Sequence, residues 1–228
     1  MEMMNYLYAI RRRLISVIVV FAFGVVLGLV FYQKILQVII FLFQLNPKNL
    51  VFTSPTEVLS LMFNIAIFCG VVLSFPYFIY QLLSLVKPAL TKKEYHFLVT
   101  LLPTSGSLLI AGLVFGVWVM RFTVSLYQKA SLSLKIGNFW GVERFLSQMI
   151  LTSISTALLF QLPIILSALI RFGLVKKAIL REKRPYIWAI LLILAVLLPP
   201  TDPLSLIILT LPLLLLFEIT LLLNPGRA

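Results

Sequence analysis

Long apolar runs separated by short charged loops dominate the pattern of hydrophobic and polar positions in this chain. A helix of about 20 apolar residues crosses a hydrocarbon core of roughly 30 Å, so such runs predict membrane spans. Six spans are expected, at about 14–32, 58–86, 97–120, 149–170, 185–198 and 204–223. The fifth run has 14 residues, which rise about 21 Å and fall short of a full crossing.

Composition agrees with this pattern. The chain has 228 residues, of which 61% are hydrophobic and 11% are charged, and a soluble domain of this size cannot bury so much apolar surface. No polar segment is long enough to fold as a separate soluble domain, so residues 1–228 are expected to form a single membrane domain. The fold class that follows is an all-α polytopic membrane protein with six transmembrane helices.

Charge distribution sets the expected orientation. The net charge of +12 does not indicate nucleic acid binding, because the basic residues lie in short loops between apolar runs. Thirteen Lys and Arg residues lie on one side of the predicted membrane and six on the other, so the majority side, with both termini, is expected to be cytoplasmic. Four prolines inside the spans are expected to kink the helices into a cupped bundle: Pro76, Pro103, Pro163 and Pro212.

Three polar positions in or beside the apolar runs are candidates for function. Glu94 is either an acid in the first turn of the third span or a carboxylate that pairs with an incoming arginine. Gln161 lies near the middle of the fourth span beside Pro163, as an interhelical hydrogen-bonding group or a polar point facing a groove. Glu218 lies about 7.5 Å from the cytoplasmic end of the sixth span. It is either functional, or snorkels to the interface, or pairs with a loop arginine.

Two helix starts carry capping residues. Ser54 and Glu57 fit a capping box with Pro55 at the first helical position. Asp202 fits an N-cap before Pro203. These acids are therefore expected to serve helix starts.

Enzymatic chemistry finds no support in the sequence. His96 is the only histidine, and the only cysteine, Cys69, lies a full span away. No Walker loop, glycine-rich phosphate cradle or paired nucleophile and base accompanies them, so no enzyme activity, metal or cofactor is expected. A secondary transporter or channel subunit would need paired ions or broken helices around a midplane site, where only Gln161 is central. A structural membrane scaffold, in which the polar positions only hold helices together, is a second possibility.

Six motifs occur in register with the six-span plan. They are LYAIRRRL at 7–14, SPTE at 54–57, PYFIYQ at 76–81 with KPAL at 87–90 and Glu94, FQLP at 160–163, KRPY at 183–186, and PPTDP at 199–203 with Pro212 and Phe217-Glu218. Together they resemble the TatC family, the multispanning receptor of the twin-arginine, Sec-independent protein translocase, over nearly the whole chain.

The resemblance implies a receptor that binds twin-arginine signal peptides of folded precursors at the cytoplasmic face. It also implies recruitment of TatA- or TatB-like single-span membrane proteins and export driven by the proton-motive force. Self-association and the lipid bilayer complete the expected partners. The expected location is the cell inner (cytoplasmic) membrane, with an organellar membrane as the alternative. The family's peptide-reading positions map to Arg11, Arg13, Pro88, Leu90 and Glu94.

Two positions depart from the family pattern. Ala9 stands where the N-terminal motif normally has an acid, and Gln161 stands where the fourth span normally has a glutamate. Both changes remove negative charge, and an amide cannot neutralise a cation or take up a proton as a carboxylate does. The chain is therefore expected to be a divergent member with weaker or altered signal recognition.

Overall fold

A computed structural model describes residues 2–42, 50–52, 54–86, 92–133, 140–199 and 202–224. Regular secondary structure in the described chain is helical except for two strands of two residues each, which pair in parallel with Leu50 opposite Trp140. The elements are α1 Glu2–Leu42, β1 Leu50–Val51, α2 Thr56–Val86, α3 Lys92–Ser133, β2 Trp140–Gly141, α4 Val142–Leu159, α5 Leu162–Arg171, α6 Lys177–Glu182, α7 Arg184–Val196 and α8 Pro203–Leu223.

Five helical stretches in the described part of the chain are long and apolar enough to cross a membrane. They are Ile10–Leu42, Thr56–Leu82, Leu101–Ser131, Val142–Arg171 and Pro203–Leu223. The remaining predicted span, 185–198, corresponds to α7, an apolar helix of 13 residues. The all-α membrane class is thus confirmed, while six complete crossings and their orientation stay predictions.

The chain packs as two compact units. The first comprises Met1–Leu102 and Asn138–Ile150, and the second comprises Pro103–Gly137 and Leu151–Ala228. The first holds α1, α2, the strands and the starts of α3 and α4, and the second holds the rest.

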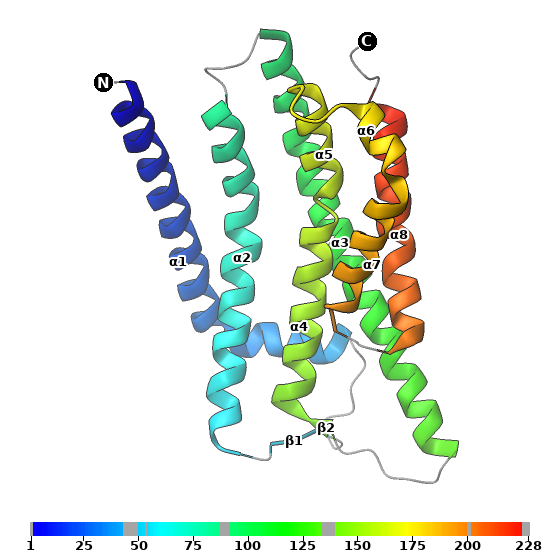
Figure 1. The fold of residues 1–228 in the computed structure, drawn as a ribbon. Helices are drawn as coiled ribbons and strands as arrows, with labels where there is room; N and C mark the ends of the chain where they lie inside the picture. The colour runs from blue at the N-terminus through cyan, green and yellow to red at the C-terminus, as the bar shows by residue number, and fades with distance from the viewer. Residues whose placement is uncertain are drawn as a thin grey trace. The chain divides into compact units, whose positions relative to one another are not determined.

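Glycines bring α1 and α2 together in the first unit, where the two helices run side by side (Figure 1). A Cβ built on Gly28 would lie 2.6 Å from the Cα of Ala66, and one on Gly24 would lie 2.9 Å from the Cα of Gly70. Small residues spaced four apart let two helix backbones approach closely, which is a major source of attraction between helices in lipid. The α1–α2 pair therefore depends on backbone contact along this seam.

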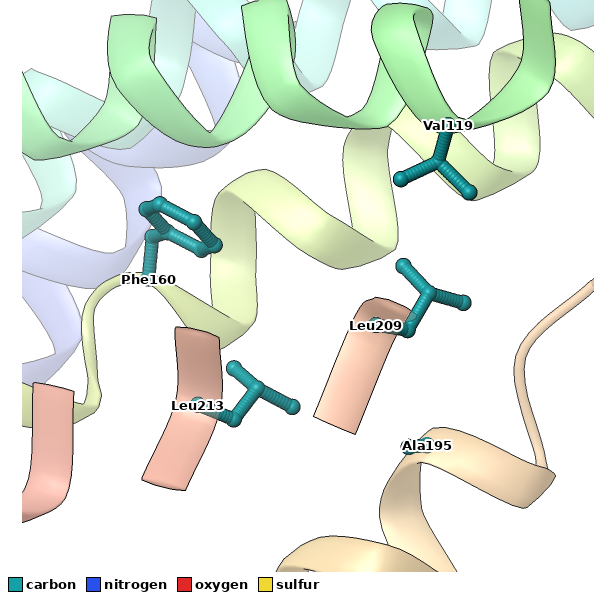
Figure 2. Packing of buried hydrophobic residues seen from close by; sticks show 5 residues of the cluster. All are labelled: Val119, Phe160, Ala195, Leu209 and Leu213. Atoms are coloured by element: carbon teal, nitrogen blue, oxygen red, sulfur yellow. The ribbon is translucent and has the colours of Figure 1, made fainter. Parts of the chain in front are cut away.

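The second unit has an apolar core contributed by several helices. Figure 2 shows Val119 of α3, Phe160, Ala195 of α7, and Leu209 and Leu213 of α8 turned toward one another. A second cluster joins α5, α6, α7 and α8, and its buried members are Ile170, Leu180, Leu191, Phe217 and Leu221. A glycine seam recurs here, because a Cβ on Gly112 would lie 2.6 Å from the Cα of Ala157.

The predicted fourth span is two helices rather than one kinked helix. α4 ends at Leu159, and α5 begins at Leu162 after a turn formed by Phe160 and Gln161. Pro163 is the second residue of α5, where its missing N–H leaves no helical bond unmade. Pro76, Pro103 and Pro212 lie inside continuous helices, and the cupped shape expected from them stays a prediction.

The structure confirms the predicted side-chain cap at the start of α8, whereas the capping box at the start of α2 stays a prediction. The carboxylate of Asp202 accepts a hydrogen bond from the Ser205 N–H at 2.8 Å, as expected for an N-cap. At the start of α2, the Glu57 N–H donates to the Ser54 backbone carbonyl at 3.2 Å, and the Ser54 hydroxyl accepts from the Thr56 N–H at 3.4 Å. That helix begins at Thr56, one residue later than the capping box predicted.

Candidate functional site

The arginine triplet of α1 divides into exposed and partly buried members. Arg11 is exposed, whereas Arg13 is half-buried and its Nη1 donates to the backbone carbonyl of Gln81 at 3.3 Å. The Gln81 amide in turn donates to Ser16 Oγ at 3.2 Å and to Tyr77 Oη at 2.6 Å. This network ties the basic end of α1 to the last two turns of α2.

Arg13 and Arg11 should therefore respond differently to substitution. We expect Arg13→Gln to destabilise the protein by about 1 kcal/mol, since it removes a partly buried charge-assisted hydrogen bond. Arg11→Gln removes the same charge from an exposed position and should leave stability unchanged. Thermal unfolding of both purified variants in detergent measures the difference, and equal midpoints would contradict it.

The loop between α2 and α3 is the other predicted part of the site. Pro88 and Leu90 lie outside the described residues. Glu94 is the third residue of α3, because that helix begins at Lys92, earlier than the predicted span. Its backbone position suits an acid at a helix start, and arginine binding by its side chain stays a prediction.

Gln161 is buried in the second unit, with 1% of its surface exposed. Its Oε1 accepts from the Ser105 hydroxyl at 2.8 Å, and its Nε2 donates to the Ser105 carbonyl at 3.2 Å. The amide thus uses a donor and an acceptor on one residue of α3. This arrangement matches the interhelical hydrogen bond that was one of its two expected roles.

Glu218 of α8 pairs with Arg184, the first residue of α7. The distance from Arg184 Nη2 to Glu218 Oε2 is 2.9 Å, and both side chains are partly exposed. Arg184 Nε and Glu218 Oε1 are buried and have no hydrogen-bond partner among the described residues. Pairing with a loop arginine was one of the expected roles, and the structure identifies that arginine as Arg184.

Two features of the site region went unnoticed in the sequence. The first is the glycine spacing of α1 and α3, Gly24 with Gly28 and Gly112 with Gly116, which is the small-residue pattern of close helix pairs. The second is a polar seam between α2 and α4, where Ser60 donates to Glu143 Oε1 at 2.8 Å. Polar residues four apart in both apolar runs, Ser60 with Asn64 and Glu143 with Ser147, were the available signal.

Metal chemistry has no candidate in the described part of the chain. Among those residues, no group of three or more His, Cys, Asp or Glu side chains could hold a metal ion. The polar groups instead form hydrogen bonds and ion pairs between helices. This is the pattern of a multi-pass helical membrane protein whose polar positions join its helices.

The comparisons place this membrane protein in a family. The family model for TatC, the Sec-independent protein translocase protein, matches residues 5–212. The chain therefore belongs to the TatC family. This membership confirms the expected function, a receptor subunit of the twin-arginine translocase and not an enzyme. It supports a receptor over a transporter, a channel or a scaffold.

The similarity to known proteins extends over nearly the whole chain. Sec-independent protein translocase protein TatCy of Bacillus subtilis is 29% identical over 227 residues, covering 99% of this chain and 89% of its own. The tatC-like protein ycf43 of Cyanidium caldarium is 28% identical over 212 residues, covering 90% and 85%. A crystal structure of a twin-arginine translocase receptor TatC matches with a TM-score of 0.85 at 24% identity, over 98% of this chain and all of that one. That likeness supports the helical fold.

Proposed function

We propose that this TatC subunit binds twin-arginine signal peptides at the cytoplasmic ends of α1, α2 and α3, with Glu94 as the carboxylate that receives an arginine. Pro88 and Leu90 would shape the loop before it, and Arg11 and Arg13 would line the N-terminal side. A guanidinium binds a carboxylate through two parallel N–H bonds, which suits a single acid to arginine recognition.

The network of Arg13 and Gln81 is the observation that most supports this assignment. It fixes the basic end of α1 against the end of α2 that leads into the loop before Glu94. All of these residues belong to the first unit. A peptide that contacts both segments would therefore meet a platform held by hydrogen bonds. Arg13 contributes to that platform by position, whereas exposed Arg11 is free to meet the peptide or lipid.

Loss of charge at two positions makes Glu94 more important in this chain. Ala9 cannot form an ion pair, and the Gln161 amide is buried against Ser105. Because both are uncharged, Glu94 would carry most of the attraction for the peptide's arginines. The proposal therefore predicts a strong dependence on that one residue.

We expect Glu94→Gln to weaken photocrosslinking to a twin-arginine peptide by about tenfold, since a charge-assisted hydrogen bond contributes about 1.5–3 kcal/mol. The crosslinker is placed on the loop before Glu94, and half-saturation is measured with purified protein. A twin-lysine peptide should crosslink more weakly to the native chain, because lysine lacks the planar fork of arginine.

Glu182→Gln is the matched control, because it removes one exposed acid from the second unit. It should leave crosslinking unchanged. Equal crosslinking by the Glu94 and Glu182 variants would remove Glu94 from the site. If the Glu94 variant crosslinks fully but no longer prefers the twin-arginine over the twin-lysine peptide, the loop contacts the peptide and Glu94 supplies only the preference for arginine.

The wider assignment follows the family. We propose six crossings in one membrane domain, with α7 as a short fifth crossing and both termini cytoplasmic, because basic residues concentrate on that side. TatA- or TatB-like single-span proteins and further copies of this chain would be the membrane partners, and the proton-motive force would drive export. The location would be the cytoplasmic membrane, or an organellar one, as plastid-type relatives allow.

A further inference from the structure

A basic surface on the second unit has no role in the function proposed above. Between Arg171 and Arg184 the chain has six basic residues and one acid, Glu182. This stretch contains the end of α5, the short helix α6 and the start of α7. The five cations that follow Arg171 fall into two groups with different surroundings.

One group anchors the stretch to the rest of the unit. Lys177 Nζ donates to the Asn224 carbonyl at 2.5 Å, and Arg184 pairs with Glu218. The Asn224 amide donates to Ser167 Oγ at 2.8 Å, which links the end of α8 to α5. Leu180 of α6 is buried in the apolar cluster with α5, α7 and α8. The stretch is thus held in a fixed position.

The other group faces outward. Lys176, Arg181 and Lys183 are exposed, and their side chains make no hydrogen bond or ion pair with the described residues. Exposed apolar side chains lie among them in the sequence, with Leu174 and Tyr186 each 70% exposed and Ile179 45% exposed. We call these six residues the basic loop surface. Charged and apolar groups together are unusual for a face that meets only water.

A lipid headgroup layer fits both kinds of side chain. The surface connects two apolar helices, so it lies where helices leave the hydrocarbon. α7 has 13 residues, which rise about 20 Å, so nearby lipids must thin toward it. Such thinning would bring phosphates within reach of the lysines and the arginine, and would place Leu174, Ile179 and Tyr186 at the acyl boundary. Basic clusters just outside a membrane helix attract anionic lipids by about 1 kcal/mol per residue.

We propose that the basic loop surface binds the headgroups of anionic phospholipids, with Lys176, Arg181 and Lys183 on the phosphates. A soluble acidic protein would not need three large exposed apolar side chains interspersed with the cations. The interaction depends only on the protein crossing a membrane, so it is independent of the peptide site at Glu94. The proposed lipid contact would hold α6, which is too short to cross the membrane, at the membrane surface.

The test uses the full-length protein, purified in an uncharged detergent and stripped of lipid. Phosphatidylglycerol or phosphatidylcholine is then titrated, and bound lipid is counted by native mass spectrometry. We expect preferential retention of phosphatidylglycerol by the native chain. The variant K176Q/R181Q/K183Q should bind phosphatidylglycerol about tenfold more weakly, because it removes three cations that attract anionic headgroups.

Two further variants separate lipid recognition from general charge and from misfolding. R121Q/K129Q/R144Q removes three exposed cations elsewhere in the chain and should keep native retention. K176R/R181K/K183R keeps all three charges on the surface and should also keep it. Equal losses in the two neutralised variants, or no loss in the first, would overturn the proposal. Native lipid retention with weakened precursor crosslinking would assign the surface to the precursor instead, which also contradicts it.

Discussion

Gly28→Leu is expected to separate α1 from α2 and to lower the free energy of unfolding by about 3 kcal/mol, the upper end for added bulk in a packed interior. A Cβ at this position would already lie 2.6 Å from the Cα of Ala66 and 3.0 Å from the Cβ of Cys69. The first obstacle is backbone, which cannot rotate away as a flexible side chain can. The helices must therefore move apart along the whole seam.

Gly106→Leu is the matched control, since a Cβ on Gly106 of α3 meets no atom within 4 Å. Both substitutions add the same side chain to a glycine inside a helix, so helix propensity and hydrophobicity change equally. Thermal unfolding in detergent and the amount of intact protein in membranes measure the outcome. If the two variants unfold at the same temperature, α1 and α2 do not make the close contact described above.

Helix positions were largely predictable because apolar length dominates in membranes. Runs of about 20 apolar residues have no stable alternative to helix in lipid, since every backbone polar group must be satisfied within the segment. The same reasoning correctly singled out 185–198 as short, and it corresponds to the 13-residue α7. The break between α4 and α5 was not predictable, because proline alone does not distinguish a kink from a new helix start.

Contacts between distant residues were the part that the sequence left open. Pairing with a loop arginine was one of three roles considered for Glu218, yet several arginines were available and only the fold selects Arg184. The spacing of Gly24 and Gly28 was visible, but their partners Gly70 and Ala66 lie on another helix. Glu94 depends on the family resemblance for its role, because an acid in a first helical turn is common for local reasons.

Gln161→Glu is the second substitution with a large expected effect, a loss of about 3–5 kcal/mol when the new side chain is ionised. The native amide accepts from the Ser105 hydroxyl and donates to the Ser105 carbonyl. An ionised carboxylate keeps the first bond but has no N–H for the second, and places its charge beside a carbonyl oxygen. In the described part of the chain, the hydrogen-bond partners of the Gln161 side chain include no cation that would balance that charge.

Gln161→Leu separates the cost of charge from the cost of lost hydrogen bonds. It should destabilise by about 1–3 kcal/mol, because it leaves the Ser105 hydroxyl without its acceptor. In a Ser105→Ala background the leucine variant should cost less than in the native chain, since bonded residues show coupling of about 0.5–3 kcal/mol. Denaturant unfolding of the four proteins in this cycle, with Gln161→Glu alongside, gives each difference. A glutamate variant as stable as the native chain would mean that this pocket accepts a carboxyl group, and that the neutral amide is not required by its packing.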